Sequence, residues 1–214
     1  MSPFHQRRRL SAITRIELVA MIAVGVVLTT LAVCVLSDAK AKSRRISCNC
    51  RLKQIGLAFG IFGADYGDNF PMSISTSKGG SMEYANEVCR HFLATSNELS
   101  TPKILACPAD TRKPAPRFSV LSNVNISYFV GLDAKESAPD VLLAGDRNLM
   151  TNGVPVGSGL VQLTTNLTVG WTARMHKNAG NAAFGDGHVD SLSSNRLHEQ
   201  LINSGVAANR LLIP

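Results

Sequence analysis

The most regular feature of the chain is an apolar run at residues 18–36, which contains no charged residue and no proline. With Ile16 and Glu17 the stretch is 21 residues long. A helix needs about 20 apolar residues to cross the hydrocarbon core of a bilayer. The run is too evenly apolar for an amphipathic surface helix, and it closely follows an arginine cluster. The pattern predicts a transmembrane helix at residues 13–36 rather than a buried core helix.

A helical period continues beyond this run, and proline is absent from residues 4–70. Six residues recur at steps of four, three, four, three and four, which places them on one helix face. They are Cys48, Leu52, Ile55, Phe59, Phe62 and Tyr66. We expect one helix at about residues 14–66, about 80 Å long, whose amphipathic part at residues 37–70 packs on a sheet. Four glycines weaken this expectation, since each costs up to about 1 kcal/mol in a helix interior. They are Gly56, Gly60, Gly63 and Gly67.

The remainder of the chain, residues 71–214, changes to short apolar segments separated by Pro, Gly, Asn and Asp. This spacing predicts an antiparallel sheet with long loops. The expected strands lie at residues 103–107, 126–130, 141–144, 160–163, 181–184 and 188–192. Asp186 and Gly187 separate the last two, and an Asp-Gly pair supplies the positive φ angles of a tight hairpin. A short helix is expected at residues 87–99, and a final helix or a loosely ordered tail at residues 196–208. The fold class is therefore α+β.

A net charge of +7 is compatible with a nucleic-acid partner, so the positions of the positive charges along the chain matter. Three positive charges are Arg7, Arg8 and Arg9, and four more follow the apolar run at residues 40–45. Beyond them acids and bases nearly cancel. No aromatic-basic interleaving accompanies the charge, so we expect membrane flanks and no nucleic-acid binding.

The five cysteines give an odd number. Cys34 lies in the apolar run and is expected to act as a small hydrophobic residue. The other four, Cys48, Cys50, Cys89 and Cys107, allow three disulfide pairings in an exported domain, and the sequence does not choose among them. A structural zinc site is not expected, because Cys48 and Cys50 have one residue between them and no second close pair exists.

The segment that enters the apolar run has a small residue, Ala12, followed by Ile-Thr-Arg-Ile-Glu-Leu at residues 13–18. It resembles a type IV prepilin leader. The resemblance implies a basic leader at residues 1–12, cleavage by prepilin peptidase between Ala12 and Ile13, and Glu17 as the fifth mature residue. The family has Gly where Ala12 stands and an apolar residue where Arg15 stands.

A carboxylate at the start of a membrane helix is costly without a partner, which makes Glu17 a functional candidate. The resemblance implies that the partner is the N-terminal amine of a neighbouring subunit in a fibre. The alternative is a hydrated Glu17 at the membrane interface. Two other processing routes, a secretory signal ending at residues 39–41 and a lipoprotein signal ending at Cys34, fit less well. The apolar region is too long for the first, and bulky Val33 precedes Cys34 in the second.

A second motif lies near the C-terminus, where nine residues separate His176 from Asp186 and Gly187. It resembles the prepilin-type processing-associated domain that is named for a His, nine spacers and Asp-Gly. The segment Leu-Lys-Gln-Ile-Gly-Leu-Ala at residues 52–58 and Cys-Pro-Ala-Asp at residues 107–110 also resemble that family.

Four side chains invite a metal or hydrolase hypothesis, because imidazoles and carboxylates can bind a divalent ion or share a proton. They are His176, His188, Asp146 and Asp186. A structural role is the favoured interpretation: His176 lies across the hairpin from Asp186 and makes one hydrogen bond that sets the register, while Gly187 meets the turn geometry. Asp146 and Arg147 are expected to form an ion pair. We expect no enzyme and no cofactor, since no nucleophile or phosphate-loop motif occurs.

These patterns predict a long N-terminal transmembrane helix that extends into a small antiparallel sheet domain, and the resemblance implies that this fold is pilin-like. The resemblance implies a structural subunit of a pilus or type II secretion pseudopilus. Its partners would be prepilin peptidase, other pilin-like subunits and the lipid bilayer. It would cross the inner (cytoplasmic) membrane once, with a periplasmic or extracellular C-terminal domain, and Leu57 and Ile61 would contact other subunits. The alternative is a membrane-tethered periplasmic metal-binding or hydrolytic domain that does not polymerise.

Overall fold

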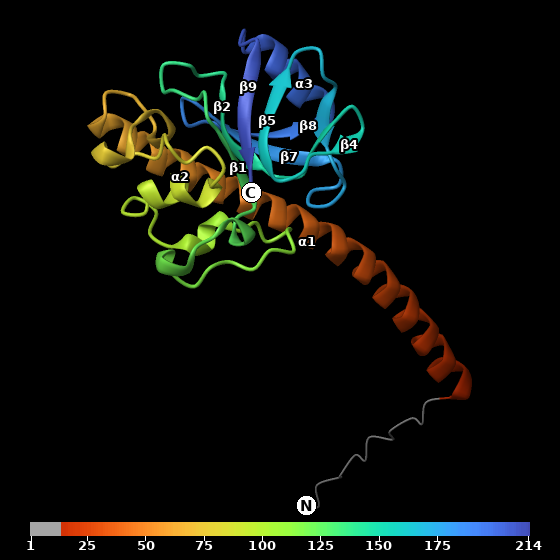
Figure 1. Cartoon of the computed structure of the whole chain (residues 1–214). Coiled ribbons are helices and arrows are strands. Elements are labelled where there is room, and N and C mark those ends of the chain that lie inside the picture. The colour runs from red at the N-terminus through yellow and green to blue at the C-terminus, as the bar shows by residue number, and fades with distance from the viewer. Residues whose placement is uncertain (1–13) are drawn as a thin grey trace, which may run out of the picture. The chain divides into compact units, whose positions relative to one another are not determined.

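The computed structural model describes residues 14–214, so the predicted cleavage site at Ala12 and Ile13 lies outside the described residues. The described residues divide into two compact units, residues 14–40 and 41–214, and each is described by itself. The first element is the helix α1, Arg15–Asp65, in 51 residues (Figure 1). It passes Gly56, Gly60 and Gly63 without a break, which confirms the predicted long helix.

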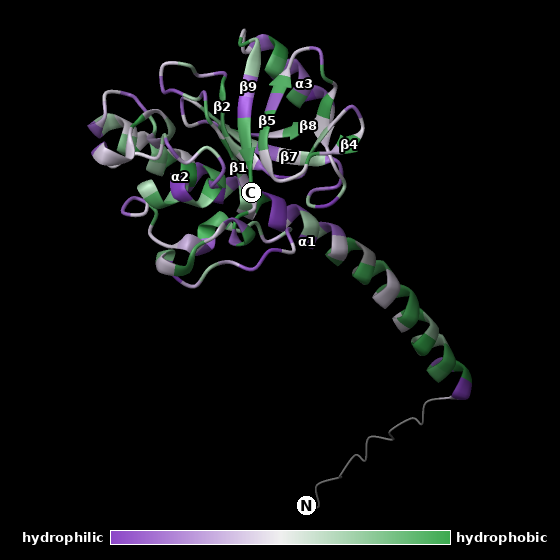
Figure 2. Ribbon diagram, in the orientation of Figure 1, coloured by the Kyte–Doolittle hydropathy of each residue, from purple (hydrophilic) through white to green (hydrophobic). Residues whose placement is uncertain are grey.

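After hydrophilic residues at its start, the first half of α1 is mostly hydrophobic (Figure 2). Among the described residues one helix is long and apolar enough to cross a membrane, and it is α1. The hydroxyls of Thr29 and Thr30 donate hydrogen bonds to backbone carbonyls three or four residues earlier. Polar groups in a membrane helix require such internal partners. At the start of the helix, Glu17 accepts hydrogen bonds from the backbone N–H and the hydroxyl of Thr14, at 2.8 and 2.9 Å.

The unit at residues 41–214 is built around two antiparallel sheets (Figure 1). The larger has the order β5-β9-β1-β2-β7-β8, with β1 at Tyr128–Gly131, β2 at Leu142–Asp146, β5 at Gly159–Thr164, β7 at Ala179–Phe184, β8 at Val189–Ser193 and β9 at Ala208–Ile213. The smaller has the order β4-β3-β6, with β3 at Leu149–Thr151, β4 at Val154–Pro155 and β6 at Val169–Trp171. The predicted α+β layout with an antiparallel sheet is confirmed.

The large sheet is covered on both faces, because alternate residues of its strands belong to two different cores. Tyr128 and Val130 of β1 pack with the second half of α1 and with α2, Val88–Ala94. Phe129, between them, packs with Trp171 and with α3, Ser194–Asn203. Five members of the predicted α1 stripe are buried, and Tyr66 is partly exposed. The amphipathic period therefore marks the face of α1 that packs on the domain.

Short 3-10 helices fill the connection between α1 and β1. They are η1 at Pro71–Ser73, η2 at Thr76–Lys78, η3 at Pro102–Leu105, η4 at Phe118–Val120 and η5 at Asn123–Asn125. The strand expected at residues 103–107 is wrong, because η3 occupies this segment. Pro102 stands at the start of η3, and the Thr101 hydroxyl caps it by accepting from the Lys103 N–H.

The other expected elements are found with shifted ends, and four strands were not expected. The helix predicted at residues 87–99 is the shorter α2, and the tail at residues 196–208 is α3 followed by β9. The remaining unexpected strands, β3, β4 and β6, are three residues or fewer in length. Strands this short cannot show the alternation of apolar and polar residues that would predict them. Their positions depend on pairing with other strands in the fold.

Candidate functional site

The Asp-Gly motif forms the turn between β7 and β8, as predicted. The Phe184 carbonyl accepts from the Gly187 N–H at 2.9 Å, and the Phe184 N–H donates to the His188 carbonyl at 3.0 Å. The loop therefore has three residues, and Gly187 has a φ of +83°. A two-residue turn with positive φ at both positions is not formed. Asp186 accepts from the backbone N–H of His188 and pairs with its imidazole.

The turn packs directly on α1. A Cβ added to Gly56 would lie 3.3 Å from the Gly187 carbonyl oxygen, so helix and turn meet backbone to backbone. A groove of about 630 Å³ runs beside this contact, between the helix and the turn, and Gly60, Glu136 and His188 line it. The two resemblance segments, residues 52–58 and the Asp-Gly pair, therefore touch each other in the fold.

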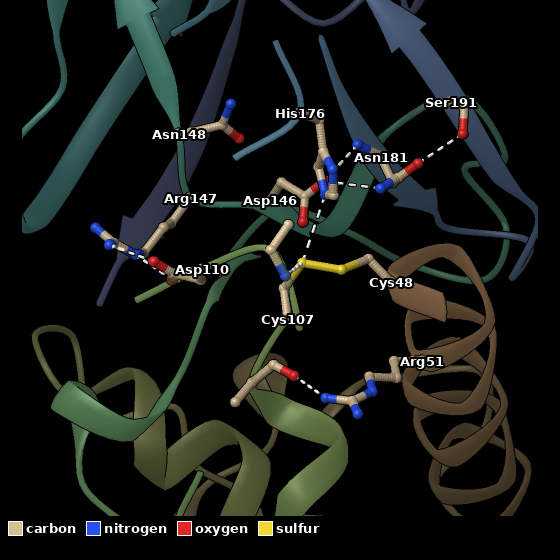
Figure 3. The surroundings of a disulfide bond; sticks show 12 residues. Cys48, Arg51, Cys107, Asp110, Asp146, Arg147, Asn148, His176, Asn181 and Ser191 are labelled. Atoms are coloured by element: carbon tan, nitrogen blue, oxygen red, sulfur yellow. Dashed lines mark hydrogen bonds and ion pairs between the residues drawn. A yellow bond between two sulfur atoms is a disulfide. The ribbon is translucent and has the colours of Figure 1, made fainter. Parts of the chain in front are cut away.

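His176 does not pair with Asp186, so this expectation is wrong. Its Nε2 atom lies 3.3 Å from Oδ2 of Asp146 and 3.4 Å from Sγ of Cys107, and its side chain is 2% exposed (Figure 3). The register of β7 and β8 is set without His176, by backbone pairing such as Ala183 with Val189. The nine spacers carry the chain from the buried His176, along β7, to the turn.

A disulfide joins Cys48 on α1 to Cys107, beside His176 (Figure 3). Cys50 is exposed and Cys89 is buried, and both are free thiols. The guanidinium of Arg51, one turn along α1 from Cys48, donates to the carbonyls of Lys103 and Ala106. A covalent bond thus connects the helix to the Cys-Pro-Ala-Asp segment, and charge-assisted hydrogen bonds connect it to the residues just before that segment.

Asp146 is fully buried at the end of β2. Its Oδ2 atom accepts from the backbone N–H of Asn181 at 2.7 Å and from the Asn181 side-chain amide at 2.9 Å. The Asn181 amide oxygen accepts in turn from the Ser191 hydroxyl at 2.6 Å. Among residues 14–214, Oδ1 of Asp146 has no hydrogen-bond partner. Burial, and then the nearby Asp146, raises the pKa of Tyr128 well above its ordinary value.

Arg147 pairs with Asp110 and not with Asp146, which corrects the expected ion pair. Its guanidinium donates to both carboxylate oxygens of Asp110 at 2.8 Å, and the Asp110 side chain is 3% exposed. Burial alone would raise the pKa of Asp110, but the hydrogen bonds and charge of Arg147, with other hydrogen bonds, leave it below its ordinary value. The last residue of the Cys-Pro-Ala-Asp segment therefore attaches this segment to the end of β2.

The four predicted metal candidates separate into two pairs. His176 and Asp146 lie together and are buried, whereas Asp186 and His188 pair with each other at the exposed turn. Across residues 14–214, one group of three or more His, Cys, Asp and Glu side chains could hold a cation. It is Cys48, Cys107, Asp146 and His176. The sequence placed Cys48 and Cys107 among disulfide candidates, and their spacing along the chain gave no sign of this cluster.

The cluster does not have the geometry of a Cys-His-Asp catalytic triad. In a triad, one imidazole nitrogen contacts the nucleophile and the other is held by the carboxylate. Here the same Nε2 atom of His176 faces both Cys107 and Asp146. The sulfur is bonded to Cys48 and is not available as a nucleophile.

A second apolar surface lies on the outer side of α1, away from the buried stripe. Ile46, Leu57 and Ile61 are 56%, 65% and 47% exposed. At 3.6 residues per turn they lie within about 60° of one another around the helix, and exposed Cys50 falls among them. We call these four residues the outer stripe.

Comparisons with protein-family models, with curated proteins and with solved structures found no match for this chain.

Proposed function

We propose that this protein is a prepilin-like, membrane-anchored subunit that prepilin peptidase processes between Ala12 and Ile13. Its role is structural, in a pilus or a type II secretion pseudopilus, with the sheet domain outside the inner membrane. The observation that carries the proposal is α1 itself. α1 is one continuous helix. The apolar stretch in its first half is not buried against other described residues, and the inner face of its second half forms part of a domain core.

The apolar first half requires a nonaqueous environment. Its large side chains from Ile16 to Leu36 are 51% to 78% exposed. At about 25 cal/mol per Å², leaving so many apolar side chains in water is strongly unfavourable, and lipid or neighbouring helices would cover them. The disulfide supports an oxidising compartment for the domain, since such bonds persist outside the cytosol.

The outer stripe supports side-by-side packing of copies. Leu57 and Ile61 extend an exposed apolar surface onto the part of α1 that is attached to the domain. Burial of each side chain between two copies would stabilise an assembly by about 1 kcal/mol or more. Glu17, whose carboxylate is held by Thr14 at the helix start, is the candidate partner for the terminal amine of a neighbouring subunit.

Oxidative cross-linking through Cys50 tests the assembly directly. In a Cys34→Ala, Cys89→Ala background, Cys50 is the one free thiol, because Cys48 and Cys107 are bonded to each other. Mild oxidation of membranes is expected to give a dimer through Cys50. Moving the thiol to position 49, by Cys50→Ser with Asn49→Cys, turns it about 100° around the helix and should reduce the dimer strongly. Equal yields for both positions, or a monomer whose Cys50 still reacts with maleimide, would contradict side-by-side packing.

The outer stripe can also be tested by charge. Leu57→Asp is expected to abolish the Cys50 dimer, because a carboxylate would be buried between two helices. Asn49→Asp, which adds the same single negative charge about 100° around the helix from Cys50, is the matched control for charge. Loss of the dimer in both variants alike would point to a general charge effect.

A further inference from the structure

The group around the disulfide contains four potential metal ligands that converge from different parts of the chain (Figure 3). Cys48 comes from α1, Cys107 from the segment after η3, Asp146 from the end of β2, and His176 from the loop before β7. One ligand atom of each lies within 4.8 Å of all the others, and all four residues are buried.

Two edges of this group already have the lengths of a tetrahedral zinc site. Zinc lies about 2.0 Å from nitrogen or oxygen ligands and about 2.3 Å from thiolate sulfur. Around a tetrahedral ion, the N–O edge is then about 3.3 Å and the N–S edge about 3.5 Å. The observed separations are 3.3 Å from His176 Nε2 to Asp146 Oδ2 and 3.4 Å from Nε2 to Cys107 Sγ.

The sulfur atoms decide when such a site can exist. In a tetrahedral site the two thiolates are about 3.8 Å apart, which is incompatible with a covalent S–S bond. We propose that the disulfide covers a latent cation site: when Cys48 and Cys107 are reduced, they bind one Zn²⁺ together with His176 and Asp146.

A buried carboxylate with unused acceptor capacity supports the assignment independently. Oδ1 of Asp146 is buried and has no hydrogen-bond partner in the part of the chain that the structure describes, although unpartnered buried oxygens are costly. Oδ2 is oriented by Asn181, which Ser191 orients in turn. Metal-binding carboxylates are held by hydrogen bonds of this kind, which fix the ligand before the ion arrives.

The chemistry balances with a dithiol reductant. The dithiol gives two electrons and two protons to the Cys48–Cys107 bond and becomes a disulfide itself, leaving two cysteine thiols. Zinc then binds as both thiols lose their protons, so loading releases protons and is favoured by higher pH. Zinc and the disulfide exclude each other, because both use the same two sulfur atoms.

A groove of about 650 Å³ leads to His176 and gives a path for exchange. Its walls are basic, with Lys42, Arg44, Arg45, Arg174 and Lys177. This positive charge opposes the approach of a cation, so loading is expected to be slow and is measured after prolonged incubation.

Cobalt and zinc binding by the full chain in detergent test the proposal. The protein is reduced anaerobically with dithiothreitol, which is then removed, and Co²⁺ or Zn²⁺ is added alone. The expected result is one ion per reduced chain, with the sulfur-to-cobalt absorption of a tetrahedral thiolate site, and none in the disulfide form. Bound Zn²⁺ should also slow re-formation of the disulfide at least tenfold, and a chelator should reverse this.

Four variants make the result specific. Cys50→Ser with Cys89→Ala should still bind one ion, whereas Cys107→Ser should lose it and the cobalt charge-transfer band. His176→Ala and Asp146→Asn should each weaken binding at least tenfold, while the sulfur-to-cobalt absorption of the bound ion still corresponds to two thiolates. Absence of binding by reduced protein that still has its folded tryptophan fluorescence would overturn the proposal. So would binding that survives Cys107→Ser and disappears with Cys50→Ser. Neither outcome bears on cleavage at Ala12 or on assembly.

Discussion

Gly56 of α1 and Gly187 of the β7–β8 turn approach so closely that a Cβ on Gly56 would lie 3.3 Å from the Gly187 carbonyl oxygen. Two sequence motifs that are about 130 positions apart therefore meet at one backbone contact. The contact explains a glycine in the middle of a helix, where glycine is otherwise unfavourable. Because neither glycine has a side chain, the backbones of the helix and the turn can approach each other closely.

Gly56 and Gly60 are expected to respond differently to substitution. A Cβ at Gly60 would meet no described atom within 4 Å, so Gly60→Ala should raise the free energy of unfolding by about 0.5–1 kcal/mol through helix propensity. Gly56→Ala should gain little, and Gly56→Val should lose about 2 kcal/mol by overpacking against the turn. Urea unfolding in nonionic detergent, followed by the single buried Trp171, measures both. Equal gains at the two positions would show that the contact is unimportant.

Removing the disulfide is expected to destabilise the domain substantially. Cys48 and Cys107 are 59 positions apart, and closing a loop of this length stabilises by about 4 kcal/mol in the chain-entropy description. The double variant Cys48→Ala, Cys107→Ala should lose up to this amount in the same urea experiment. Cys50→Ser is the control, since its exposed thiol makes no bond, and its effect should stay within about 0.5 kcal/mol. A large effect of Cys50→Ser would indicate a different pairing.

Much of this architecture could be predicted from the sequence where local pattern and final environment agree. The stripe from Cys48 to Phe62 marks the buried face of α1 because burial on a helix follows its period. β9 could not be predicted in this way. Only its last three residues form an apolar run, and its strand conformation comes from pairing with β1 and β5 on both sides. The segment at 103–107 reads as a strand, but Pro102 and the Thr101 cap start a 3-10 helix there.

The candidate site was less accessible from sequence than the fold. His176, Asp186 and Gly187 were identified from the motif, but the partner of His176 was not. Cys107 is 69 positions from His176, and no local rule brings them together. The same applies to Asp110 and Arg147, which only the fold places in contact.

His91 is expected to make the domain less stable in mild acid. Burial lowers the pKa of His91 to about 4 from an ordinary value of 6.5, and its Nδ1 atom contacts the Ser81 hydroxyl at 2.8 Å. Between these pH values the unfolded chain binds a proton that the folded chain does not, so stability falls as the pH falls from 6.5 to 4, by about 3 kcal/mol. His91→Asn should remove this part of the pH dependence. Parallel stability profiles of the two proteins between pH 7 and 4 would contradict the account.

Asp110 and Arg147 should contribute at a lower pH. The folded pKa of Asp110 is below its ordinary value, so the pair stabilises the fold above that value and loses its contribution as the pH falls through the lowered pKa. Arg147→Met should cost about 3 kcal/mol at pH 7, because it leaves a buried carboxylate unpaired. Asp110→Asn should cost less and should flatten the acid limb of the stability curve. The reverse order of the two variants at pH 7 would show that the guanidinium is not needed to compensate the buried charge.

The N-terminus of the protein purified from membranes tests the central claim most directly. Mass spectrometry of the N-terminal peptide is expected to find a chain that begins at Ile13, with Glu17 as its fifth residue and the apolar helix retained. A chain that begins at Met1, at Cys34 or at Lys42 would contradict processing as a prepilin-like subunit.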